Sequence, residues 1–293
     1  MTYVILDLEW NGAFSRRAHG YFNEIIEIGA VKLDKHMRPI DRFGAVIRPI
    51  VSRKLNEWVA DLTNITGQEL QGGTTFDKAI EGLSAFIGPQ PAAILTWSNT
   101  DLLVLLENFR FFKGIERVPF MAAYADVQQY FQQRLELGKG QQVALTKACE
   151  MVCVQDDDVA AHRAPDDCVM TARVLQKIYE KSSFKRLPLK ADDAFYARLN
   201  FKPVTLCDLK DERVKEKDLT FKCPQCRRAL RRCGEWKLRG YAFFAEMRCK
   251  KCGKAFTARV QIKTAFEGVS VKRKLTEKET SGAQTPQKDT IGG

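Results

Sequence analysis

Two carboxylates lie two residues apart at the end of a short apolar run near the N-terminus. The segment TYVILDLEWN, residues 2–11, places Asp7 and Glu9 directly after an apolar run that is too short for a helix, which predicts a buried strand. Because alternate side chains of a strand share a face, the two acids point to the same side, about 7 Å apart along the backbone. Oxygen ligands placed in this way are typical of a magnesium or manganese site, although a strand end whose acids only face water shows the same pattern.

Three more residues could add to such a site. Asp101 follows the predicted strand Ala93–Trp97 and begins an apolar helix. The carboxyl ends of strands are where open α/β sheets bind ligands, although an acid that acts together with Thr100 is also a favourable helix cap. His162 lies on a predicted loop, where most histidines are surface residues, and Asp167 lies in the first turn of the helix that follows.

The strands and helices that we expect to position these residues form an α/β domain with a mixed sheet. The first strand and the predicted strands Ile25–Asp34 and Arg42–Ile47 have short connections, which favours an antiparallel meander. We expect Gly12–Asn23 to be a connection, Ser52–Leu70 a broken helix, and Thr75 the cap of an amphipathic helix. Further predicted elements are strand Val118–Ala125, helices Asp126–Leu137 and Val143–Met151, and a last helix with Val169, Ala172, Leu175 and Ile178 on its buried stripe.

Length and composition limit the classes of protein that the chain can belong to. The 293 residues suffice for one domain of ordinary size and a small second one, and an apolar fraction of 45% is normal for a globular protein. The sequence does not begin with a basic segment and a long apolar stretch, and runs such as Leu102–Leu106 are far too short to span a bilayer. We therefore expect a cytoplasmic protein without a membrane partner, whose cysteines are free thiols or metal ligands.

Positive charge is concentrated in the last third of the chain. Residues 1–200 hold 24 of the 47 basic and 25 of the 36 acidic residues, a balance of −1, so the remainder has a balance of +12. Such an excess is typical of a segment that binds a polyanion, because each Lys or Arg that neutralises a phosphate releases counterions. A basic tail without a specific partner has the same composition.

Two cysteine pairs in this basic segment have the spacing of a zinc ribbon. Cys223 and Cys226 form one pair, Cys249 and Cys252 form the other, and 22 residues separate the pairs. Four thiolates can hold one tetrahedral Zn²⁺ in a closed structural site. The other five cysteines are interpreted as structural thiols: Cys149, Cys153 and Cys168 on buried helical stripes, and Cys207 and Cys233 outside the zinc pattern.

Basic and aromatic side chains alternate in the ribbon, where Trp236–Met247 is predicted to be a strand pair and Ala255–Lys263 a third strand. This combination is expected of a clamp for nucleic acid, although several of the aromatic residues must form the ribbon's own small core. The basic residues are Arg227, Arg228, Arg231, Arg232, Lys237, Arg239, Arg248, Lys250, Lys251 and Lys254, and the aromatic residues are Trp236, Tyr241, Phe243 and Phe244.

Taken together, the motifs of the first domain resemble the DEDDh 3′-to-5′ exonuclease superfamily, in particular the ERI-type RNA exonucleases and their bacterial relatives. The shared motifs are DxE at Asp7 and Glu9, EIIEIGAV at 24–31, ITG at 65–67, an aspartate that opens a mid-domain helix, and His-x-x-x-x-Asp beginning at His162. The resemblance covers about residues 1–182. Proofreading exonucleases have the same core.

The resemblance implies a ribonuclease H-like mixed sheet flanked by helices, with two catalytic Mg²⁺ or Mn²⁺ ions. The catalytic and metal-binding carboxylates would be Asp7, Glu9, Asp101 and Asp167, and His162 would be the general base that activates water. Asp166 competes with Asp167, but the five-residue step from His162 favours Asp167. The residues before Asp101, Ser98-Asn99-Thr100, depart from the family's second motif.

By the same resemblance, Leu8, Trp10 and Asn11 would hold the 3′-terminal nucleotide, although Trp10 could equally be a core residue. The implied reaction is metal-dependent 3′-to-5′ hydrolysis of single-stranded nucleic acid, with RNA favoured over DNA, releasing nucleoside 5′-monophosphates. Two metal ions would stabilise the attacking and leaving oxygens. The alternatives are a DNA proofreading or repair exonuclease, and a zinc-ribbon protein that binds nucleic acid and has a degenerate nuclease fold.

The sequence thus predicts four regions. They are a DEDDh exonuclease domain over residues 1–182, a linker over 183–218, a small zinc ribbon acting as a nucleic-acid clamp over 219–269, and a disordered tail over 270–293.

Overall fold

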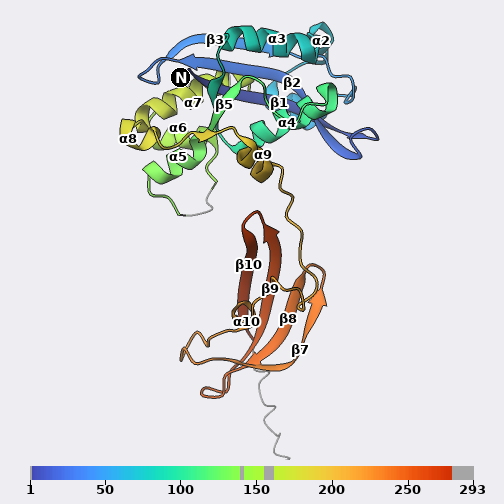
Figure 1. The fold of residues 1–293 in the computed structure, drawn as a ribbon, viewed down its shortest axis with the longest axis vertical. Coiled ribbons are helices and arrows are strands. Elements are labelled where there is room, and N and C mark those ends of the chain that lie inside the picture. The colour runs from blue at the N-terminus through green and yellow to red at the C-terminus, as the bar shows by residue number, and fades with distance from the viewer. Residues whose placement is uncertain (1, 139–141, 155–161, 279–293) are drawn as a thin grey trace, which may run out of the picture. The chain divides into compact units, whose positions relative to one another are not determined.

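The computed structural model describes residues 2–138, 142–154 and 162–278 (Figure 1). The chain divides into two compact units, residues 1–199 and 200–293, which are described separately. Within the described ranges, every helix is too short or too polar to cross a membrane.

The first unit is built on a six-stranded mixed sheet with the order β3-β2-β1-β4-β5-β6 (Figure 1). Strands β1, β2 and β3 are antiparallel to one another, β1, β4 and β5 are parallel, and β6 is antiparallel to β5. This arrangement confirms the predicted fold class. The strands are β1 (Tyr3–Ser15), β2 (Gly20–Leu33), β3 (Pro39–Val46), β4 (Ala92–Thr96), β5 (Met121–Asp126) and β6 (Leu189–Lys190).

The segment Gly12–Asn23, which was predicted to be a connection, instead continues the hairpin of β1 and β2. The pairing extends to Ser15 opposite Gly20, so only residues 16–19 form the turn. Gly12 suits this strand because the ring of Tyr21 lies across it, 2.4 Å from where a Cβ atom would be. Glycine in a strand interior commonly marks such a close approach.

Helices cover both faces of the sheet, and the alternation along β1 decides which residues face which helices. Val4, Leu6 and Leu8 belong to one core cluster, with α3 and α4, whereas Ile5 belongs to another, with α5, α6 and α7. Asp7 and Glu9 are in phase with Ile5 and therefore face α7. The helices are α1 (Glu57–Thr63), α2 (Gly67–Gly72), α3 (Phe76–Ile87), α4 (Asn99–Lys113), α5 (Val127–Arg134), α6 (Leu145–Met151), α7 (Ala164–Ile178), α8 (Lys181–Phe184) and α9 (Asp193–Leu199).

The first unit extends beyond residue 182, where the sequence placed the start of a linker. Strand β6 pairs with β5. The side chain of Phe184 is buried in one core cluster and that of Tyr196 in the other. The many charged residues of this segment favoured a linker, but the buried rings of Phe184 and Tyr196 pack the segment against the rest of the unit.

The second unit contains a four-stranded antiparallel sheet with the order β10-β9-β8-β7. Strand β10 was predicted to be the start of a disordered tail, but Val269, Val271 and Leu275 alternate along it and pack on the core of this unit. The rest of the predicted tail, residues 279–293, lies outside the described residues. The elements are α10 (Glu216–Leu219), β7 (Arg231–Arg239), β8 (Ala242–Arg248), β9 (Ala255–Ala265) and β10 (Gly268–Glu277).

Helix α7 rests directly on the backbone of β2 at Gly29, which lies opposite Asp7 in the β1–β2 pair. A Cβ atom at Gly29 would lie 2.1 Å from the carbonyl carbon of Ala164 and 2.3 Å from the nitrogen of Pro165. Only glycine therefore allows the first turn of α7, which carries Asp167, to approach the β1 acids this closely.

We predict that Gly29→Ala lowers the free energy of unfolding by about 2–4 kcal/mol, because backbone atoms of α7 must move away from the sheet. Urea denaturation measures the effect. Gly72→Ala in α2 is the matched control, since nothing lies within 4 Å of its added methyl group, and it should be neutral or slightly stabilising. Equal effects of the two substitutions would contradict the close approach of α7 to β2.

Candidate active site

Three carboxylates meet above β1. The side-chain oxygens of Asp7, Glu9 and Asp167 include atoms that all lie within 4.8 Å of one another. The two β1 acids face α7, and Asp167 lies in the first turn of that helix. The structure thus brings together residues that are 160 positions apart in the chain, in the grouping that a divalent metal requires.

Asp101 lies next to this group from the side of β4 and α4. Its Oδ1 atom accepts a hydrogen bond from the backbone N–H of Leu8 at 3.2 Å, and only 6% of its surface is exposed. The cap of α4 is Ser98, whose Oγ accepts from the N–H of Thr100 at 3.2 Å. Capping therefore does not account for Asp101, which is instead held against the strand that carries Asp7.

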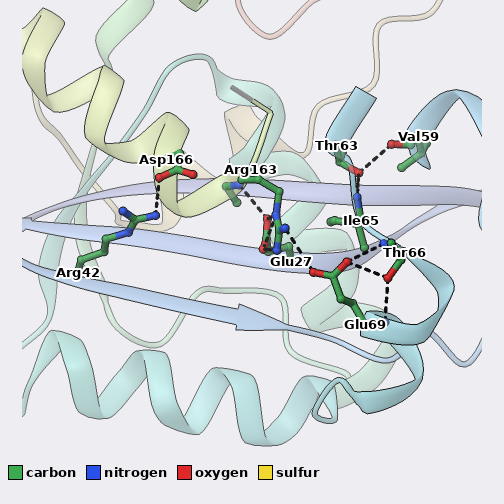
Figure 2. Close-up of polar contacts among 10 residues, drawn as sticks. Glu27, Arg42, Val59, Thr63, Ile65, Thr66, Glu69, Arg163 and Asp166 are labelled. Atoms are coloured by element: carbon green, nitrogen blue, oxygen red, sulfur yellow. Dashed lines mark hydrogen bonds and ion pairs between the residues drawn. The ribbon is translucent and has the colours of Figure 1, made fainter. Parts of the chain in front are cut away.

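The neighbouring residues Asp166 and Asp167 have different partners. Asp166 forms an ion pair with Arg42 of β3 at 2.6 Å (Figure 2), whereas Asp167 joins the β1 acids. The backbone N–H of His162 donates to Oδ1 of Asp167 at 3.2 Å, and the backbone of His162 has a φ of 65°. His162 is half-buried, and burial raises the pKa of Asp167 while this backbone hydrogen bond opposes the shift.

Burial and mutual repulsion make these acids hard to ionise. Burial raises the pKa of Asp7 well above its ordinary value, and the charges of Asp101 and Asp167 raise it further. Burial, followed by the charges of Asp167 and Glu27, raises the pKa of Glu9 to about 8. Burial raises the pKa of Asp101 to about 7 although the N–H of Leu8 opposes the shift, and burial also raises the pKa of Asp167. Hard oxygen donors in such an anionic cluster fit Mg²⁺ or Mn²⁺, which would neutralise them.

A second acid of the EIIEIGAV motif, Glu27, fixes the start of α7, and the sequence analysis missed this role. Glu27 is 2% exposed and lies opposite Glu9 in the sheet. Its carboxylate accepts from Nη2 of Arg163 at 2.6 Å and from the backbone N–H of Ala164 at 2.9 Å. Arg163 also reaches Glu69 of α2 at 3.4 Å (Figure 2). An acid with apolar neighbours on both sides in a strand was the available signal, because a buried charge requires a partner.

The three residues expected to hold the terminal nucleotide occupy different environments. The side chain of Leu8 is in the core and that of Trp10 is half-buried against the same cluster. Asn11 is fully buried, where its amide donates to the carbonyl of Lys54 at 2.9 Å and accepts from the N–H of Asn56 at 3.1 Å. The side chain of Asn11 therefore anchors the segment before α1, and Trp10 is the member of this set whose side chain is partly exposed.

In the second unit, the four cysteines of the two pairs converge. Their sulfur atoms lie within 4.8 Å of one another, with 3.6 Å between Cys223 and Cys252 and 3.4 Å between Cys226 and Cys249. Zinc–sulfur bonds of about 2.3 Å in a tetrahedron place sulfur atoms about 3.8 Å apart, so the arrangement fits a structural Zn²⁺. Of the remaining cysteines, Cys153 is exposed rather than buried as predicted.

The two cysteine pairs form matching turns. The carbonyl of Cys223 accepts from the N–H of Arg227, and that of Cys249 accepts from the N–H of Gly253, each at 2.9 Å. Both donors have a left-handed backbone, with φ of 57° and 71°. Backbone N–H groups within the turns, that of Cys252 foremost, lower the pKa of Cys249 to about 6, whereas a hydrogen bond with the Cys249 sulfur raises the pKa of Cys252 to about 11.

Comparisons with known proteins show the family of the chain. The exonuclease family model, RNase T, matches residues 4–175. The probable 3′-5′ exonuclease KapD of Bacillus subtilis (strain 168) is 28% identical over 186 residues, which are 61% of this chain and 84% of that protein. The chain therefore belongs to the exonuclease family that this model describes.

Solved structures have the same fold. The nuclease domain of 3′hExo, a DEDDh family member bound to rAMP, has a TM-score of 0.52 and 20% identity, over 60% of this chain and 90% of that one. Cell-death related nuclease 4 (CRN-4) has a TM-score of 0.52 and 20% identity, over 78% of this chain and 87% of that one.

The raised pKa of Glu9 predicts how stability depends on pH when divalent ions are absent. The folded protein holds this proton with a pKa of about 8, against 4.5 ordinarily, so ionisation removes stability as the pH rises through this window. We expect Glu9→Gln to raise the free energy of unfolding by roughly 1–3 kcal/mol above the window and to change it little below the window. Urea denaturation at both ends of the window measures the difference.

The exposed Glu81 of α3 provides the control, since Glu81→Gln should give no gain at either pH. Mn²⁺ should raise the melting temperature of the unsubstituted protein more at alkaline than at acidic pH, because its ligands must be deprotonated. If Glu9→Gln had the stability of the unsubstituted protein at alkaline pH, repulsion at this site would be refuted.

Proposed function

We propose that this protein shortens single-stranded nucleic acid from its 3′ end, RNA in preference to DNA, and releases nucleoside 5′-monophosphates. The observation that carries the proposal is the convergence of Asp7, Glu9 and Asp167 beside Asp101, all buried or half-buried at one place in the sheet. The rAMP bound to the related 3′hExo domain supports RNA as the substrate.

The four carboxylates would hold the metal ions in this proposal. When bound, Mg²⁺ or Mn²⁺ would supply positive charge to the attacking and leaving oxygens of the phosphodiester. Asp7 has a carboxylate oxygen within 4.8 Å of those of Glu9 and Asp167, and Asp101 bonds to the N–H of the next residue, Leu8. Asp7 would therefore be the most central of the metal ligands.

His162 would act as the general base. It is half-buried, and its backbone N–H donates a hydrogen bond to Oδ1 of Asp167, which holds the residue beside the acids. A ring nitrogen of His162 would take the proton of the attacking water, a role that suits imidazole because its ordinary pKa is about 6.5. The Glu27–Arg163 ion pair holds the residue that follows His162 in the chain.

Digestion of 5′-labelled single-stranded RNA and DNA of matched sequence, with Mg²⁺ or Mn²⁺, tests the proposal. We expect a ladder that shortens from the 3′ end, faster on RNA. His162→Ala should slow it by about 10²–10⁴-fold, the usual contribution of a general base, and Asp7→Ala should abolish it.

Asp166→Asn is the matched control for the acid cluster, because Asp166 adjoins Asp167 in the chain but pairs with Arg42. It should keep activity within a few-fold of the unsubstituted protein, whereas Asp167→Asn should not. Faster digestion of DNA would favour a proofreading or repair exonuclease, and a ladder that persists in Asp7→Ala would refute the catalytic assignment.

A further inference from the structure

The sheet of the second unit has one face without a covering layer among the described residues. Phe256, Ala258, Val260 and Ile262 of β9 are buried in the core of this unit. Arg259, between Ala258 and Val260, and Lys263, directly after Ile262, point to the opposite side and are exposed. We call that side the open face. Its members used below are Lys237, Phe244, Arg259, Lys263, Lys272 and Lys274.

A row of side chains crosses all four strands of the open face. Lys237 of β7 lies opposite Phe244 of β8, Phe244 lies opposite Arg259 of β9, and Arg259 lies opposite Lys274 of β10. Lys272 lies on the same face of β10, two residues before Lys274. One half-buried aromatic ring is thus flanked by cations on both sides.

Like charges directly opposite each other destabilise a sheet, so the pairing of Arg259 with Lys274 lowers the stability of this unit relative to a pair of opposite charges. Glu246, an acid on the same face, is engaged by Lys278, and its charge is also felt by Lys237. In the part of the chain that the structure describes, Arg259, Lys272 and Lys274 form no ion pair. A polyanion lying across the face would relieve their repulsion.

Other cations and aromatic residues of this unit pack within its fold and do not lie on the open face. Arg273, between Lys272 and Lys274, points to the other side, where its guanidinium lies 4.5 Å from the ring centre of Phe221. Trp236 and Phe243 pack in the core, and Tyr241 is 72% exposed in the turn between β7 and β8. Phe244 is therefore the aromatic residue that the open face presents among its cations.

We propose that the open face binds the sugar–phosphate backbone of a single-stranded nucleic acid, with Phe244 stacking on a base. Cations that follow the phosphates and an aromatic ring that stacks without regard to sequence are the combination that single-strand binding requires. The balance of +12 in residues 201–293 adds a long-range attraction. The inference rests on the proposed function in one respect, namely that the bound strand is the one that is shortened.

Binding of fluorescein-labelled single-stranded RNA and DNA to the full chain, followed by fluorescence anisotropy, tests this site. Asp7→Ala in every variant prevents digestion. The open-face variant Lys237→Gln, Arg259→Gln and Lys274→Gln is compared with Lys202→Gln, Lys210→Gln and Lys222→Gln, which remove the same charge at three exposed lysines of the second unit outside its four strands.

We expect the open-face variant to raise Kd at least tenfold for both oligonucleotides. Its slope of log affinity against log salt concentration should fall by about 2, because each phosphate contact on a single strand contributes about 0.7. The control variant should change Kd less than threefold. Phe244→Leu should weaken binding about tenfold without changing the salt slope, whereas Tyr241→Leu should have little effect.

The proposal would be overturned if the open-face variant and the control variant weakened binding equally, since net charge alone would then explain the affinity. Unchanged binding would overturn it too and would point to an acidic protein as the partner of this face. Zinc content and thermal melting show whether each variant is folded, and Phe244→Leu keeps an apolar side chain to protect the sheet.

Hydrolysis assays without Asp7→Ala separate this proposal from the exonuclease assignment. The open-face variant should hydrolyse the p-nitrophenyl ester of thymidine 5′-monophosphate at the same rate as the unsubstituted protein, and long RNA with a raised KM but similar kcat. Failure of the unsubstituted protein to hydrolyse either substrate would count against the active site, while the anisotropy measurements would still decide the open face.

Discussion

Mutual repulsion among acids that are held together away from water is the constraint on which the first unit depends. Burial and neighbouring charges raise the pKa values of Asp7, Glu9, Asp101 and Asp167 together, so the site is costly until cations enter it. Residues around such a cluster must therefore hold each acid in place. Functional sites commonly retain this kind of cost because the same charges perform the chemistry.

The rigid support comes from three contacts around the cluster. The backbone N–H of Leu8 holds Asp101 against β1, and the absence of a side chain at Gly29 lets the first turn of α7 lie on β2. Glu27 then binds both Arg163 and the N–H of Ala164, which fixes the turn between His162 and Asp167. Each contact joins two segments that are far apart in the chain and determines where a member of the acid cluster lies.

The sequence predicted the parts that local patterns specify. The apolar run before Asp7, the cap at Thr75 and the two cysteine pairs follow spacing rules and lie in the structure as elements of the expected kind. Contacts between distant segments could not be predicted from local patterns. The role of Glu27 depends on its ion pair with Arg163, and the many lysines of β10 made this strand resemble a disordered segment. Which aromatic residues of the ribbon face the core and which lie on the open face depends on the strand register.

The number of Mn²⁺ ions that bind to the zinc-loaded protein at neutral pH, counted by calorimetry and electron paramagnetic resonance, shows directly whether the acid cluster is a metal site. We expect two ions per chain close enough for their spins to couple, with the coupled signal lost in Asp7→Asn and retained in Asp166→Asn. Folded protein that binds no Mn²⁺, or that binds it equally well in Asp7→Asn, would show that the acid cluster is not a metal site.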